Sequence, residues 1–234
     1  MNFKSIYQFI LSQSADPNNP KVLLKELLQL HNFIYKQLSS VAVAYGNGTH
    51  PKHRVTKYHD FFVDNTDENE SVLDLGSGRG DVTYDVAKKT KNQVIGMDMN
   101  GHNLAYANST YQADNLKFVK GNICTDVPLN HFDVVIMSNV LEHLKDRVEL
   151  LRTITERTTP NKILLRIPYF EREWMVPIKQ ELGVEYFLDP THEIEYRYEE
   201  FYAEMEQAGL KVDSLKANWG EIWAVCVKEN KDEL

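Results

Sequence analysis

Apolar residues are spaced differently in the two parts of the chain. Up to residue 65 they recur every three or four positions, which is the period of a helix that buries one face. The stretches with this spacing are residues 2–11, 21–43 and 53–63. The polar, acidic stretch 64–70 is typical of a linker. We therefore expect an N-terminal helical cap over residues 1–65 and a second domain over residues 66–234.

From residue 71 onwards, short continuous apolar runs alternate with helical patterns. Such runs are typical of strands buried on both faces, and the alternation predicts a mostly parallel sheet covered by helices. The predicted strands are residues 72–75, 93–97, 116–119, 132–137, 162–167, 210–215 and 222–227. The predicted helices are residues 81–89, 104–114, 147–157 and 198–208. The predicted fold class is therefore α/β, Rossmann-like, with helices on both faces of the sheet.

Composition narrows the classes of partner and compartment. The 234 residues carry a net charge of −8, which disfavours DNA or long RNA as a ligand. No apolar run approaches the ~20 residues of a membrane span, and the N-terminus is a poor signal peptide. Cys124 and Cys226 lack a CxxC partner, which disfavours a thiolate metal site. The last four residues, KDEL, are expected to be a charged tail. We expect a cytoplasmic protein without a membrane span. A homodimer is one possible assembly of this chain.

A glycine loop follows the first predicted strand, in the segment VLDLGSGRGD over residues 72–81. Glycines let the backbone turn tightly and approach a ligand closely. Asp74 and Asp81 flank the loop, and Asp81 stands where a dinucleotide-binding loop carries its third glycine. Two carboxylates repel a pyrophosphate but suit an ammonium and a sulfonium. The segment therefore predicts S-adenosylmethionine as cofactor, with a nicotinamide-dependent oxidoreductase as the rival class.

Three further segments carry polar residues at strand ends. Asp98 ends the second strand and suits the ribose hydroxyls, and Met99 suits the adenine face or the core. Asn122 and Ile123 follow the third strand and suit the adenine edge. The expected cofactor-binding residues are Asp74, Gly76, Gly78, Asp98, Met99, Asn122, Ile123, Ser138 and Asn139.

These motifs, in this order over residues 72–144, resemble class I methyltransferases of the small-molecule type. The resemblance implies a seven-stranded sheet with an antiparallel last strand and a cofactor across the carboxyl ends of the first strands. Asn122 departs from the Asp of many relatives. The DPTH segment at residues 189–192 looks like that of bacterial methyltransferases acting on sugars or surface-polysaccharide precursors.

Methyl transfer to oxygen or nitrogen needs a base for the acceptor's proton, and histidine suits this role near neutral pH. His143 and His192 are the candidates, although His143 can equally serve as a helix-start residue. An alternative is a divalent metal held by Glu142, His143 and His192. Some methyltransferases of RNA ends and quinone precursors carry a Glu-x-x-Glu-His pattern, but Asn139 replaces its first Glu here. We therefore expect no metal, and unchanged turnover with a chelator.

A basic cluster over residues 50–57 stands out in an acidic chain. It forms either a solvated face or a site for an anionic acceptor, where an arginine gives a two-pronged contact. The expected acceptor-binding residues are His53, Arg54, Lys57 and Arg172. The sequence thus predicts an O-methyltransferase for a phosphorylated or nucleotide-linked sugar-like metabolite. Its rivals are a metal-assisted enzyme for an RNA terminus or quinone precursor, and a non-catalytic subunit that keeps the fold.

Overall fold

The computed structural model describes Ser5, Gln8 and residues 19–229. All but two residues of the helix predicted over residues 2–11 lie outside the described residues. The helix predicted over residues 21–43 is confirmed as α2 (Pro20–Tyr45), where Asn19 caps the first turn by accepting the N–H of Val22.

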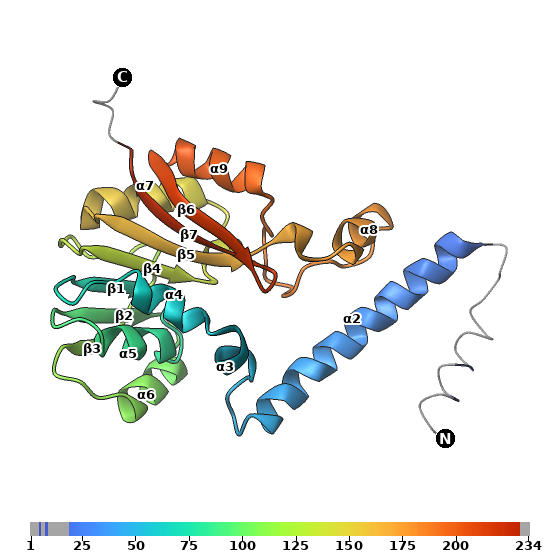
Figure 1. Ribbon diagram of the computed structural model, residues 1–234, viewed down its shortest axis with the longest axis horizontal. Coiled ribbons are helices and arrows are strands. Elements are labelled where there is room, and N and C mark those ends of the chain that lie inside the picture. The colour runs from blue at the N-terminus through green and yellow to red at the C-terminus, as the bar shows by residue number, and fades with distance from the viewer. Residues whose placement is uncertain (1–4, 6–7, 9–18, 230–234) are drawn as a thin grey trace. The chain divides into compact units, whose positions relative to one another are not determined.

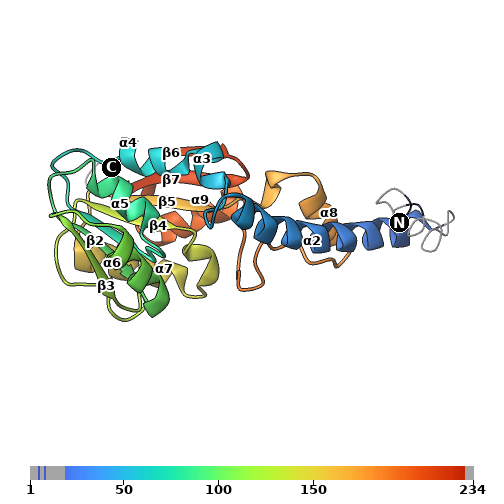
Figure 2. The same ribbon diagram turned by 90° about the horizontal axis from the view of Figure 1, so that it is seen from below.

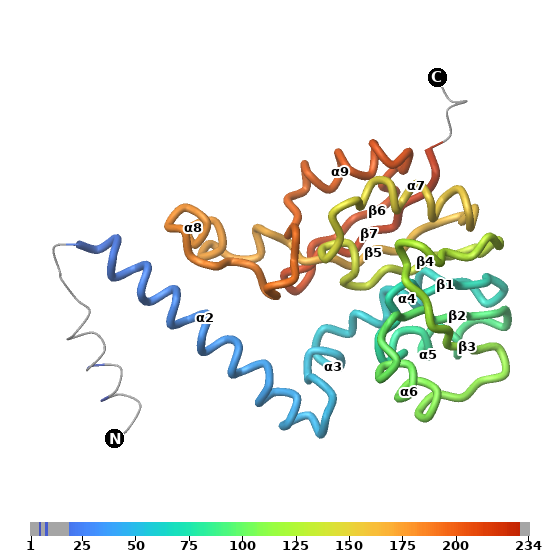
Figure 3. Tube along the Cα trace, turned by 180° about the vertical axis from the view of Figure 1, so that it is seen from behind, coloured from blue at the N-terminus to red at the C-terminus, as the bar shows by residue number. Residues whose placement is uncertain are grey.

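The described part of the chain contains one seven-stranded sheet in the order β3-β2-β1-β4-β5-β7-β6. The Cα trace in Figure 3 shows the strands side by side in this order. Strand β7 is antiparallel to both of its neighbours, and the five strands from β1 to β5 are parallel. All seven predicted strands are confirmed, as is the antiparallel last strand. They are β1 (Val72–Leu75), β2 (Val94–Asp98), β3 (Leu116–Lys120), β4 (Val134–Ser138), β5 (Lys162–Pro168), β6 (Leu210–Asn218) and β7 (Glu221–Lys228).

Helices cover both faces of this sheet (Figures 1 and 2). Alternate residues of a strand point to opposite faces, so two hydrophobic cores form. Val72 and Val134 pack with α4 (Tyr58–Asp64) and α5 (Asp81–Ala87). Leu73 and Val135 pack with α7 (Arg147–Thr158) and α9 (Tyr198–Gln207) on the other face.

Two predicted helices differ from the observed ones. The helix expected over residues 104–114 is α6 (Gly101–Thr110), because the side chain of Asn100 accepts the N–H groups of His102 and Asn103 and starts the helix earlier. The single helix expected over residues 53–63 is wrong. The structure has α3 (Lys52–Thr56) and α4, separated by Lys57 in the left-handed conformation (φ 52°).

The chain forms two compact units. The first contains the described residues up to 55 together with residues 171–187, and the second contains residues 56–170 and 188–229. In the first unit α2 packs against α8 (Met175–Glu181), a helix that the apolar pattern did not predict, and Asn32 donates to the carbonyl of Glu185 at 2.6 Å. The boundary expected after residue 65 differs from this division, because Tyr58 and Phe62 of α4 are buried against the sheet. Among the described residues no helix combines the length and apolar character needed to cross a bilayer.

Candidate active site

The loop after β1 is shaped by glycines with positive φ angles. Gly76 and Gly80 have φ angles of 77° and 84°, which side-chain-bearing residues rarely adopt. A Cβ atom on Gly76 would lie 2.6 Å from the side chain of Val140, and one on Gly80 would lie 2.5 Å from that of Phe118. The glycines are therefore required both by conformation and by close packing.

Asp98 at the end of β2 holds this loop in place. Its Oδ2 accepts the backbone N–H of Gly78 at 2.8 Å, and its Oδ1 accepts that of Asn100 at 2.7 Å. Each carboxylate oxygen can accept a further hydrogen bond, so a ribose hydroxyl can still donate to Asp98. The carboxylate predicted as a ribose acceptor also fixes the loop conformation.

Asp74 lies in β1, two residues before Gly76 of the loop, and is 2% exposed. The hydroxyl of Thr83 in α5 donates to its Oδ2 at 2.6 Å. Burial, with a smaller contribution from the charge of Asp98, raises the pKa of Asp74 to about 7. The carboxyl groups of Asp74 and Asp98 beside this loop favour a cationic ligand, such as the expected sulfonium cofactor.

The residues expected around the adenine are more exposed. Met99 is 68% exposed, and Ile123 packs partly against the core. The side-chain oxygen of Asn122 accepts the N–H of Cys124 at 3.0 Å. One lone pair of this oxygen therefore serves the local turn, which leaves a second for an adenine amino group.

The turn after β4 is stabilised by Arg166, a buried charged residue that was not predicted from the sequence. Arg166 of β5 is 4% exposed and donates to Ser138 Oγ at 3.1 Å, and its carbonyl accepts the N–H of Asn139 at 2.7 Å. Its guanidinium pairs with Glu221 of β7 through bonds of 2.6 and 2.5 Å, and it lies 3.7 Å from the ring centre of Tyr58. A lone arginine inside an otherwise apolar strand was the available clue.

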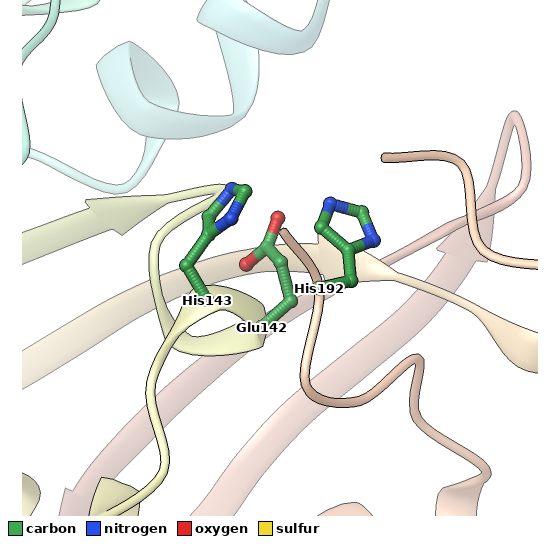
Figure 4. Close-up of side chains that lie close together, drawn as sticks. All are labelled: Glu142, His143 and His192. Carbon is green, nitrogen blue, oxygen red and sulfur yellow. The ribbon is translucent and has the colours of Figure 1, made fainter. Parts of the chain in front are cut away.

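Glu142, His143 and His192 converge beyond the end of β4. The first two belong to the short 3-10 helix η1 (Leu141–His143), and His192 comes from a loop about fifty residues later. Their possible ligand atoms all lie within 4.8 Å of one another. Figure 4 shows the Glu142 carboxylate between the two imidazoles. The carbonyl of Glu142 accepts the N–H of Glu193 at 2.7 Å, which ties the loop to η1.

The electrostatic state of this cluster is unusual. Glu142 is 0% exposed, and neither of its carboxylate oxygens has a hydrogen-bond partner among the described residues. Burial raises the pKa of Glu142 to about 8. Burial, followed by the neighbouring His192, lowers the pKa of His143. A buried carboxylate without a donor is costly, so this position favours a proton or a bound cation.

The DPTH segment supports the two histidines. The hydroxyl of Thr191 donates to Asp189 at 2.6 Å, and Thr191 Oγ1 lies 2.9 Å from Nδ1 of His143. Nδ1 of His192 lies 3.0 Å from Oε1 of Glu195. Thr191 was noted from the sequence only as part of the DPTH segment, without a role, and Glu195 was not predicted. The local clue to Glu195 was an acid three residues after a candidate base.

The predicted acceptor-binding residues are not part of this cluster. His53 and Arg54 belong to α3, at the end of the first unit, and Arg54 is exposed. Lys57 is exposed at the start of the second unit. Arg172 donates to the carbonyl of Tyr186 at 2.7 Å within the first unit. Their role toward an acceptor stays a prediction.

Comparison with known proteins identifies the family of this chain. A family model described as a methyltransferase domain matches residues 66–211, so the chain belongs to that family. A ubiquinone biosynthesis O-methyltransferase from Rhodopseudomonas palustris is 25% identical over 166 residues, which are 63% of this chain and 64% of that relative.

Two solved structures share the fold. An S-adenosylmethionine-dependent methyltransferase from Aquifex aeolicus has a TM-score of 0.60 at 16% identity, covering 84% of this chain and 97% of that one. The magnesium protoporphyrin IX methyltransferase of Synechocystis, solved with bound S-adenosylhomocysteine, has a TM-score of 0.59 at 14% identity, covering 74% and 83%. The chain therefore combines membership of the methyltransferase-domain family with the fold of these S-adenosylmethionine-dependent methyltransferases, and it spans less than two thirds of the length of the curated relatives that it matches. None of the relatives named here is described as a sugar methyltransferase.

Proposed function

We propose that this enzyme methylates a hydroxyl group of a quinone precursor, and that Glu142, His143 and His192 bind the acceptor oxygen with the help of a divalent cation. The observation that carries the proposal is the fully buried Glu142 carboxylate, which has no hydrogen-bond partner among the described residues and lies between two imidazoles. The name of the Rhodopseudomonas relative supports the acceptor class.

The reaction is an in-line displacement at the methyl carbon. A lone pair of the acceptor oxygen forms the new O–C bond, the C–S bond breaks, and its electrons stay on sulfur to give S-adenosylhomocysteine. The acceptor's proton leaves to water, because the imidazoles that bind the cation have no free lone pair. The protein mainly positions the two reactants, which accounts for several kcal/mol of a barrier.

The cluster fits a divalent cation. One carboxylate and two neutral imidazoles form a donor set typical of first-row transition metals. Binding a cation would also give the Glu142 carboxylate the partner that it lacks in the folded chain. Such a cation would lower the pKa of a bound acceptor hydroxyl. Contrary to the expectation drawn from Asn139, we therefore expect turnover to depend on metal.

The decisive experiment combines a chelator with an acceptor panel. The enzyme is dialysed against EDTA, assayed with labelled S-adenosylmethionine, and then reconstituted with Mn²⁺, Mg²⁺ or Zn²⁺. We expect turnover to vanish and to return with one of the metals, and Glu142→Gln to lose this recovery. Unchanged turnover after EDTA would refute the metal and leave the histidines as bases.

The acceptor panel tests the substrate class in the same assay. We expect methylation of a hydroxylated quinone precursor and none of a nucleotide-linked sugar or an RNA terminus. Methylation of the sugar alone would restore the anionic acceptor, which the basic residues Arg54 and Lys57 still favour as the second candidate. Methylation of the RNA terminus alone would support a metal-assisted RNA methyltransferase instead.

A further inference from the structure

A buried carboxylate lies directly behind His192. Oε1 of Glu195 accepts the backbone N–H of Leu188 at 2.5 Å and lies 3.0 Å from Nδ1 of His192. The side chains of His192 and Glu195 are 6% and 0% exposed, so water competes little for this contact. In the proposed function the acceptor site uses the part of the His192 ring that lies away from Glu195. Glu195 itself therefore does not touch the reacting atoms.

The contact determines which nitrogen of His192 carries the hydrogen. An ionised carboxylate can only accept hydrogen bonds, so Nδ1 must be the donor. In a neutral imidazole with its hydrogen on Nδ1, the lone pair belongs to Nε2. Figure 4 shows one ring nitrogen of His192 on the side of the Glu142 carboxylate. Because Nδ1 is directed at Glu195, this nitrogen is Nε2.

We propose that Glu195 is a positioning residue that holds His192 in the Nδ1–H tautomer, so that Nε2 presents its lone pair to Glu142 and His143. The inference rests on the proposed function, in which His192 either accepts a proton or binds a cation, since both roles need a lone pair directed into the site. Carboxylates that hold a ligating histidine in this way typically change metal affinity 10–100-fold when removed.

His143 offers an internal comparison. Its Nδ1 lies 2.9 Å from Thr191 Oγ1, whose own hydrogen is donated to Asp189. The hydroxyl oxygen is therefore an acceptor here, and Nδ1 of His143 is again the donor. His143 is exposed, however, so water competes for this contact. We expect the tautomer of His192 to be the more strictly fixed of the two.

The test reads the tautomer directly in metal-free and cofactor-free protein. Long-range ¹H–¹⁵N spectra of ¹⁵N-histidine-labelled enzyme at about pH 8, where an ordinary imidazole is neutral, distinguish the two tautomers. The signal of His192 among the eight histidines is assigned with His192→Gln. The variants are Glu195→Ala, Glu195→Gln and a matched control, Glu193→Gln, whose side chain pairs with Lys145 at 3.8 Å.

We expect wild-type His192 to be the Nδ1–H tautomer, Glu195→Ala to shift it toward Nε2–H, and Glu195→Gln to retain it through the amide oxygen. Mn²⁺ affinity measured by calorimetry should fall about 10–100-fold in Glu195→Ala and stay unchanged in Glu193→Gln. An Nε2–H tautomer in the wild-type protein overturns the inference even if Glu195→Ala fails to fold. An unchanged tautomer in a folded Glu195→Ala variant also overturns it. Absence of Mn²⁺ binding to the wild type refutes only the metal in the proposed function, because the tautomer is read without metal.

Discussion

Asp74 gives the sharpest quantitative prediction, since its burial works against folding at neutral pH. Its pKa of about 7 compares with an ordinary value of 3.8. Each pKa unit corresponds to about 1.4 kcal/mol, so ionising this carboxyl in the folded state costs about 4 kcal/mol above neutral pH. The folded protein holds the proton more tightly than the unfolded chain, so stability falls as pH rises from about 4 to about 7 and is constant above that window.

Asp74→Asn removes the charge and keeps an oxygen that can accept the Thr83 hydroxyl. An unpaired amide group offsets part of the gain, by about 1 kcal/mol. We expect the cofactor-free variant to be more stable than wild type by about 2–3 kcal/mol at about pH 8. The advantage should shrink by about 2–3 kcal/mol at about pH 5, where roughly half of the cost has disappeared.

Urea unfolding of both proteins at the two pH values measures this difference, with Asp60→Asn as a control at an exposed aspartate. Calorimetry should also show that Asp74→Asn binds S-adenosylmethionine about tenfold more weakly, because a charged partner of the cationic cofactor is lost. A stability difference that is the same at both pH values would refute the reasoning, since the carboxyl would then titrate alike in both states.

Asp98→Ala should remain folded and lose about 1–3 kcal/mol of S-adenosylhomocysteine affinity, since the ribose loses its acceptor; unchanged affinity by calorimetry would contradict this role. Arg166→Ala should lower the free energy of unfolding by about 3–5 kcal/mol because it leaves the Glu221 carboxylate without its charged partner. Urea unfolding showing a loss below about 1 kcal/mol would count against a strong pair. Arg54→Ala should raise the acceptor's KM without affecting cofactor binding, and Arg54→Lys should restore the KM only partly because an ammonium lacks the two-pronged fork. An unchanged KM would mean that Arg54 lies on a solvated face and does not bind the acceptor.

The strands of the sheet and the glycine loop were predictable from local residue patterns. Continuous apolar runs with helical stretches between them specify strands buried on both faces, because period and burial are properties of a few neighbouring residues. The positive φ angles at Gly76 and Gly80 are likewise local demands that only glycine meets without strain. For the same reason the cofactor class was predictable from residues 72–81.

Local patterns were less reliable where packing overrides them. Lys57 breaks a helical pattern that is continuous in sequence, and Tyr58 and Phe62 after the break are buried against the sheet. The helix α8 went unnoticed because its seven residues carry little helical periodicity. In both places tertiary contacts, rather than the spacing of apolar residues, decide the elements.

The proposed acceptor site depends on contacts that form only in the folded chain. Glu142 and His143 were visible as candidates beside His192, but their convergence depends on a loop that returns from about fifty residues away. The burial that leaves Glu142 without a partner among the described residues is a property of that assembled environment. Glu195 acquires a role only because the fold places its carboxylate behind the ring of His192. A side chain's charge and tautomer depend on solvent exclusion and on neighbours distant in sequence, and these exist only once the chain has folded.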